Sequence, residues 1–231
     1  MQRRKFTSAL ISASGLGVFS VWPAARAAGL TESDAALGVR AALERGANAA
    51  VGLLGRSGGF LDNPKVRIEL PGFLDSAAKM LRFTGQQQRV DELVVAMNRA
   101  AEEAVPQARS LLVNAVKSMS VEDARQILAG GDDSATQFFS RKTREPLGVK
   151  FLPIVTRATE RVSLADRYNA VAGQAASLGL LGKDDANLQQ YVTAKALDGL
   201  YLVIGEEERK IRQDPVGTGS ALLTKVFGAL K

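Results

Sequence analysis

The chain of 231 residues contains no cysteine and no histidine, and it has a single tryptophan, Trp22. Without cysteine there is no disulfide framework, no thiolate zinc site and no cysteine nucleophile. Without histidine there is no serine–histidine–aspartate triad and no histidine metal cluster. Any chemistry is therefore left to carboxylates, lysine, arginine, tyrosine and hydroxyl groups, and this restriction favours binding over catalysis.

Residues 1–27 have the three parts of a bacterial export signal. Residues 3–5 are all basic, residues 6–22 carry no charge, and residues 25–27 read Ala-Arg-Ala, a small-x-small cleavage site. The run Arg-Arg-Lys-Phe is typical of a twin-arginine signal, and the alternative is an ordinary secretory signal that holds two arginines. Either route predicts cleavage of residues 1–27 and a periplasmic or otherwise exported product, residues 28–231.

The formal net charge of +6 is concentrated in that N-terminal segment. Four basic and no acidic residues lie in it, so cleavage would lower the net charge to +2. The remaining sequence has no basic run interleaved with aromatic residues, which argues against a nucleic-acid partner. It also has no apolar run long enough to span a membrane.

Almost everything after residue 28 is predicted to be helical. Strong helix formers dominate, and apolar residues recur at three- and four-residue spacing. We expect about ten helices in one compact all-α domain, with the longest over residues 188–212. Its nearly uncharged middle predicts a central helix surrounded by other helices. Pro146 is predicted to open a helix, Pro153 to kink or divide it, and residues 220–230 to form a terminal amphipathic helix.

One segment near residues 65–70 breaks the helical pattern. Turn chemistry at Gly58-Gly59 and at residues 62–64 precedes it, and Val66, Ile68 and Leu70 then alternate with charged residues. Alternation predicts a short extended segment. It is either half of a small hairpin or an extended strap across the helices.

Two groups of polar residues are candidate ligand sites. Asn98, Arg99 and Glu102 share a predicted helix and could bind an anion or a divalent cation. The alternative is a solvated face with helix-stabilising ion pairs. Asp198 stands in an apolar stretch, so a buried carboxylate paired with Lys195 is expected there. That pair is either part of a ligand pocket or a structural ion pair.

Glu206 is the sixth candidate, as the first of three successive carboxylates. Successive helical residues point about 100° apart, so the three cannot converge on one ion. One or two of them could join acids from elsewhere in the fold, and the alternative is a solvated helix end. We predict no metal site, and the pattern indicates no particular cofactor.

Six short segments form an ordered set of motifs along the chain. They are GFLDNPKVRI at residues 59–68, LPG at 70–72, MNRAAE at 97–102, LAGGDDSAT at 128–136, KALDGL at 195–200 and KIRQDP at 210–215. Together they resemble an exported bacterial family, the domain-of-unknown-function family numbered 4197, over about residues 30–230. The resemblance implies a single exported domain, and because the family label carries no reaction it implies no catalytic residues.

The leading hypothesis is a non-catalytic exported helical protein that binds a small apolar or amphipathic ligand, or a protein partner. Small alanine and glycine residues crowd the predicted helices, which allows close packing or a groove. A second hypothesis is a carboxylate enzyme that uses a divalent metal. It predicts that Asp198, Glu102, Arg99 and Glu206 converge in one cleft. A third is a structural protein that acts through an oligomer interface.

Overall fold

The structure is a computed structural model that describes residues 32–160, 162–177, 179, 185 and 187–214. The predicted export signal and the helix predicted over residues 220–230 lie outside these residues. The described residues form eight α-helices, two short 3₁₀ helices and no strand, which confirms the all-α class with slightly fewer helices than the ten expected. The elements are α1 (Glu32–Leu54), η1 (Gly72–Leu74), α2 (Asp75–Phe83), α3 (Gln87–Ala104), η2 (Val105–Gln107), α4 (Ala108–Lys117), α5 (Val121–Ala129), α6 (Ser134–Thr159), α7 (Ser163–Ser177) and α8 (Leu188–Gln213).

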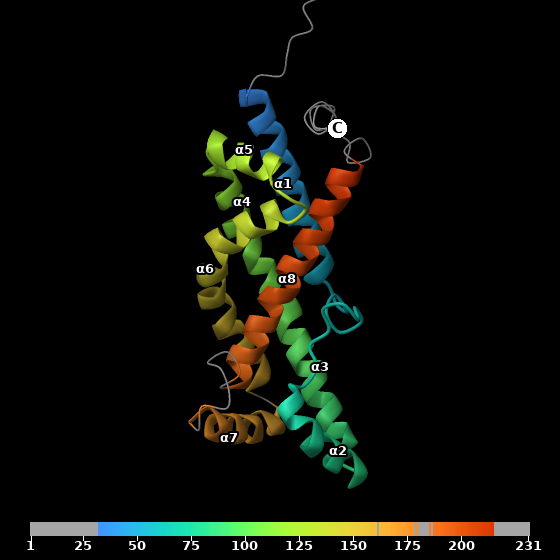
Figure 1. Ribbon diagram of the computed structural model, residues 1–231. Helices are drawn as coiled ribbons and strands as arrows, with labels where there is room; N and C mark the ends of the chain where they lie inside the picture. Colours follow the sequence, from blue (N-terminus) through green and yellow to red (C-terminus); the bar gives the residue numbers. More distant parts are fainter. Residues whose placement is uncertain (1–31, 161, 178, 180–184, 186, 215–231) are drawn as a thin grey trace, which may run out of the picture.

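The helices form an elongated bundle with two different ends (Figure 1). Helix α8 packs mainly on α6 and α1, and α3 packs mainly on α6. Helices α4 and α5 pack on α1 at one end, and α2 and α7 lie at the other end (Figure 1). Buried apolar residues from all eight helices form one main core. No helix among the described residues is long and apolar enough to cross a membrane.

Helix α6 runs unbroken through both of its prolines. The predictions that Pro146 opens a helix and that Pro153 divides one are therefore wrong. Both prolines are exposed, and their seven-residue spacing places them on the same outer face of the helix. The carbonyl groups that lose a helical donor belong to Lys142 and Val149, which are also exposed, so water can replace the missing donors.

Helix α8 is a central element, but it is not enclosed on every side. Lys195, Asp198 and Leu202 form an exposed strip along it, and that part of the prediction is wrong. Full enclosure would bury two charged side chains, at a cost of several kcal/mol for each unpaired charge. A neighbouring side of the helix packs closely, because at Gly199 a Cβ atom would lie 2.7 Å from the Phe60 ring.

The extended segment is a strap rather than half of a hairpin. We define the strap as residues 66–71, which begin at the end of a turn and continue without helix or strand and without a strand partner among the described residues. Val66 and Ile68 are buried in the core together with Phe60, which precedes the strap. The strap lies across α3 and α8 and leads directly into η1, which positions the elements at the α2–α7 end.

Candidate functional site

Asn98 of α3 anchors the strap. Its Oδ1 accepts the Ile68 N–H at 2.8 Å, and its Nδ2 donates to the Ile68 carbonyl at 2.8 Å and to the Val94 carbonyl at 2.8 Å. The side chain is fully buried. One carboxamide therefore satisfies the backbone groups that a neighbouring strand would otherwise satisfy.

Glu102 and Arg99 hold the loop that precedes the strap. Glu102 Oε1 accepts the N–H groups of Phe60 and Leu61, each at 3.1 Å. Arg99 Nη1 donates to Glu102 Oε2 at 2.6 Å and to Ser57 Oγ at 2.7 Å. Burial raises the pKa of Glu102, but the hydrogen bonds from Leu61, Arg99 and Phe60 outweigh it, so the net pKa lies below its ordinary value. The carboxylate therefore stays charged and accepts hydrogen bonds from the loop backbone.

The interpretation of this helix face as solvated is therefore wrong for Asn98 and Glu102, which are both buried. A helical stripe of polar residues does not show by itself whether it faces water or a loop. The decisive feature is that the backbone N–H groups of Phe60, Leu61 and Ile68 find their acceptors on α3, and these groups come from a segment 30 to 42 residues earlier in the chain. The polar side-chain atoms of Asn98, Arg99 and Glu102 thus form hydrogen bonds to other groups of the chain.

Asp198 and Lys195 occupy the exposed strip of α8. The Asp198 side chain is 51% exposed and pairs with Arg144 of α6 at 2.6 Å, so the expected burial and the expected pairing with Lys195 are both wrong. The Lys195 ammonium lies 5.7 Å from the centre of the Tyr191 ring. The residues next to Asp198 in the sequence are apolar, but they point to other sides of the helix. An apolar stretch around Asp198 therefore does not imply that Asp198 itself is buried.

The three successive carboxylates at the end of α8 point in three directions, as their helical spacing predicts. Glu206 accepts from Lys65 Nζ at 2.7 Å, and Glu207 accepts from Lys210 Nζ at 2.6 Å. Glu208 turns inward and is buried. The interpretation as a solvated helix end therefore fails for Glu208.

Glu208 caps the N-terminus of α6 from another helix. Its two oxygens accept the backbone N–H groups of Ala135 and Thr136 at 3.0 and 2.9 Å, and Thr136 Oγ1 donates at 2.9 Å. Arg212 Nη2 lies 2.8 Å away and balances the charge. An anion at a helix N-terminus interacts favourably with the helix dipole. The sequence analysis missed this role, because the capped residues lie more than 70 positions away.

The six predicted site residues do not form one cluster. Glu102, Asp198 and Glu206 each pair with a different cation, namely Arg99, Arg144 and Lys65. No group of three or more acidic residues in the described part of the chain is arranged to hold a metal ion.

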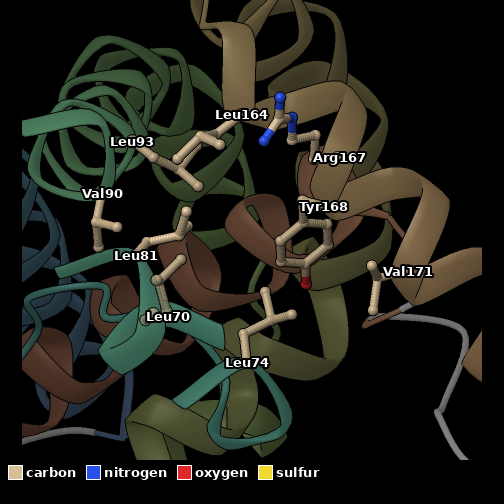
Figure 2. Close-up of a pocket in the computed structure, with 10 residues that line it drawn as sticks. Leu70, Leu74, Leu81, Val90, Leu93, Leu164, Arg167, Tyr168 and Val171 are labelled. Atoms are coloured by element: carbon tan, nitrogen blue, oxygen red, sulfur yellow. The ribbon is translucent and has the colours of Figure 1, made fainter. Parts of the chain in front are cut away.

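A separate apolar pocket lies at the α2–α7 end of the molecule (Figure 2). Its volume is about 290 Å³, and its walls come from the end of the strap, η1, α2, α3 and α7. Eight of the ten lining residues are leucine, valine or alanine. The lining residues are Leu70, Leu74, Ala78, Leu81, Val90, Leu93, Leu164, Arg167, Tyr168 and Val171.

Tyr168 supplies a polar atom inside this apolar lining. The residue is only 3% exposed, and its hydroxyl has no hydrogen-bond partner. Figure 2 shows the hydroxyl pointing between Leu74 and Val171. Burial, with smaller contributions from Tyr191 and Asp185, raises the pKa of Tyr168 well above its ordinary range. The hydroxyl is therefore protonated and available to donate.

Among the residues that the structure describes, Arg167 is the only charged one that lines the pocket. It is exposed, and no ion pair joins it to any other residue that the structure describes. Figure 2 shows its guanidinium beside Leu93 and Leu164, on a different side of the pocket from the Tyr168 hydroxyl. The site thus combines a large apolar surface with two separated polar groups.

Only a weak signal for this pocket is present in the sequence. Leu164, Tyr168 and Val171 recur at helical spacing on α7, and Val90 and Leu93 do so on α3. Such stripes predict buried faces, and they do not show whether the opposing faces meet or leave a gap. Here α2 and α7 both pack on α3, and a cavity remains between them.

A family model described as "Protein of unknown function (DUF4197)" matches residues 29–228. No curated protein and no solved structure matches the chain.

Proposed function

We propose that this chain, which belongs to the DUF4197 family, binds a small, elongated, mainly apolar molecule in the pocket between α2, α3 and α7. The observation that carries the proposal is the buried Tyr168 hydroxyl, which lacks a partner inside an otherwise apolar cavity. Leaving such a group unpaired costs about 1–3 kcal/mol, and a ligand that accepts its hydrogen bond recovers part of that cost.

The lining supports the same proposal. Small-molecule sites are mostly apolar with a few placed polar groups, and cavities of about 300 Å³ lie at the lower end of their range. Covering apolar surface contributes about 25 cal/mol for each Å² removed from water. Phe73 and Val171 are partly exposed at this end of the molecule, so apolar surface also continues outward from the pocket.

The proposed binding takes place outside the inner membrane. This part rests on the predicted export signal in residues 1–27, which consists of a basic start, an uncharged stretch and a small-x-small cleavage site. A fusion of residues 1–31 to a reporter enzyme that is active only after export tests it. Retention of the reporter in the cytoplasm would contradict export without affecting the pocket.

A neutral fluorescent probe tests whether the pocket binds apolar molecules. N-phenyl-1-naphthylamine gains emission when it leaves water, so titration of the protein should give a saturable rise with one site. Ala78→Phe fills the pocket from α2 and should weaken probe binding about tenfold, because the probe loses its contact surface. The matched control is Ala49→Phe on an exposed position of α1, which should bind like the wild type.

A second pocket variant keeps the test valid if Ala78→Phe does not fold. Val171→Phe narrows the pocket from its exposed rim, where the change disturbs little of the core. Equal probe affinity in the wild type and in both pocket variants would overturn the proposal. Extraction of the purified protein followed by mass spectrometry then identifies any molecule that co-purifies with it.

A further inference from the structure

We propose that the ligand is a single-chain carboxylate with an oxygen atom along its chain, of the hydroxy- or oxo-fatty-acid type. The carboxylate pairs with Arg167, the alkyl chain lies against the leucine-rich walls, and the chain oxygen accepts from Tyr168. This inference rests on the proposed function, because it names the chemical class of ligand for the same pocket.

The charge at the pocket supports a singly charged anion. Among the described residues, Arg167 is the only cation in the lining, and no described carboxylate pairs with it. Guanidinium groups bind carboxylates through two parallel N–H···O hydrogen bonds. A phosphate monoester carries nearly two negative charges at neutral pH and needs more cations than this pocket supplies.

The walls fit a narrow alkyl chain. Leu70, Leu74 and Leu81 come from the strap, η1 and α2, and they lie across the pocket from the α7 residues (Figure 2). Aliphatic side chains dominate the described lining, and Tyr168 is its only aromatic residue. Apart from Arg167 and the Tyr168 hydroxyl, this lining offers apolar contacts and no partner for a second charged head group.

The Tyr168 hydroxyl is the reason for placing an oxygen atom along the alkyl chain of the ligand. It lies on a different side of the pocket from the Arg167 guanidinium, so one carboxylate does not satisfy both groups (Figure 2). A plain alkyl chain would leave the hydroxyl unpaired, as it is in the unliganded structure. A hydroxyl or keto oxygen on the chain is a hydrogen-bond acceptor that removes this penalty.

Displacement of N-phenyl-1-naphthylamine by three ten-carbon compounds tests the head group. Decanoate should bind up to about fivefold more tightly than decanol or decylamine, the range expected for an ion pair at an exposed arginine. Arg167→Gln should remove this preference when each affinity is expressed relative to the probe affinity of the same variant. Arg45→Gln, at an exposed position of α1, is the matched control and should keep the preference.

A series of monohydroxydecanoates tests the chain oxygen. At least one isomer should bind more tightly than decanoate to the wild type, and Tyr168→Phe should abolish that gain when both affinities are expressed relative to the variant's own affinity for decanoate. If decanoate and decanol bind equally, or if no isomer exceeds decanoate, the ligand class is wrong although the pocket still binds apolar molecules. If the probe itself does not bind, the proposed function fails.

Discussion

The hydroxyl groups of the three tyrosines differ in their hydrogen bonding, and this difference distinguishes the tyrosine that lines the pocket. Tyr191 donates to the Glu69 carbonyl at 2.8 Å, and Tyr201 shares a hydrogen bond with Thr143 Oγ1 at 2.9 Å. Tyr168 is as deeply buried and has no partner. Buried polar groups in native proteins are nearly always paired, so an unpaired one indicates a specific role.

Removal of the hydroxyl should therefore have opposite effects at two of these positions. Tyr168→Phe is expected to raise the free energy of unfolding of the ligand-free protein by about 1 kcal/mol, because the unpaired group is lost. Tyr201→Phe is expected to lower it by about 1 kcal/mol, because Thr143 loses a hydrogen bond. Urea unfolding followed by circular dichroism measures both values. Destabilisation by Tyr168→Phe as large as that by Tyr201→Phe would show that its hydroxyl has a partner.

At the scale of the helix, α6 depends on α8 for its N-terminal cap. Asp133, the N-cap residue, accepts a side-chain hydrogen bond from Gln137 Nε2 at 2.9 Å but makes no capping hydrogen bond to the helix backbone. Glu208 supplies the acceptors instead, and Arg212 binds both Glu208 and the hydroxyl of Ser134. This arrangement links the start of one 26-residue helix to the end of the other.

Neighbouring glutamates of α8 offer a controlled test of that cap. Glu208→Gln should lower the free energy of unfolding by about 2–3 kcal/mol, because it removes the negative charge that caps α6 and weakens the hydrogen bonds from Ala135, Thr136 and the partly buried Arg212. Glu206→Gln breaks only the exposed pair with Lys65 and should cost under about 1 kcal/mol. Both values come from chemical unfolding at neutral pH. Equal effects at the two positions would contradict the capping role.

Local rules predicted the helices well. The capping box of Ser120 and Asp123 starts α5, and the apolar spacing gives α3 and α8 close to their observed bounds. These elements are set by residues within a few positions of one another. The prolines of α6 were misjudged because their effect depends on which face meets water, a property of the tertiary structure.

The strap was one of two structures that the sequence predicted for its segment, but the contacts that hold it and the candidate pocket could not be predicted from the sequence. Asn98 and Glu102 were singled out as polar residues, but their partners in the loop and the strap are long-range. The position of the pocket was not predicted. A cavity forms where apolar helix faces do not fit together, and each of these faces by itself has the pattern of an ordinary buried helix face. Hydrophobic periodicity reports which side of a helix is buried and gives no information on how completely it is covered.

At the scale of the whole molecule, the pocket lies where the bundle has the fewest supporting contacts. The main neighbours of α2 are α3 and η1, and those of α7 are α3 and α8. Both walls therefore depend on α3, whereas α1 at the other end packs against α4, α5 and α8. Regions with few packing contacts open locally at low free energy, so the pocket walls should open more readily than the rest of the bundle.

Hydrogen exchange with mass spectrometry tests this division of the molecule. In the free protein, peptides from α2 and α7 should exchange within short labelling times, while peptides from α3 and α6 stay protected. A ligand that binds only the closed pocket should slow exchange in α2 and α7 in proportion to 1 + [L]/Kd. Exchange through local opening of α1 and α4 should stay unchanged, because these helices do not line the pocket.

The Ala78→Phe variant separates binding in the pocket from general stabilisation. With decanoate present it should lose the protection of α2 and α7, because the filled pocket no longer takes up the alkyl chain. Ala49→Phe should retain the protection. Equal slowing in α1 and in α7 of the wild type would mean that the amphiphile binds elsewhere or stabilises the fold as a whole. Protection confined to α2, α7 and the facing part of α3 would instead place the ligand between the two least supported helices, where its binding couples them through α3.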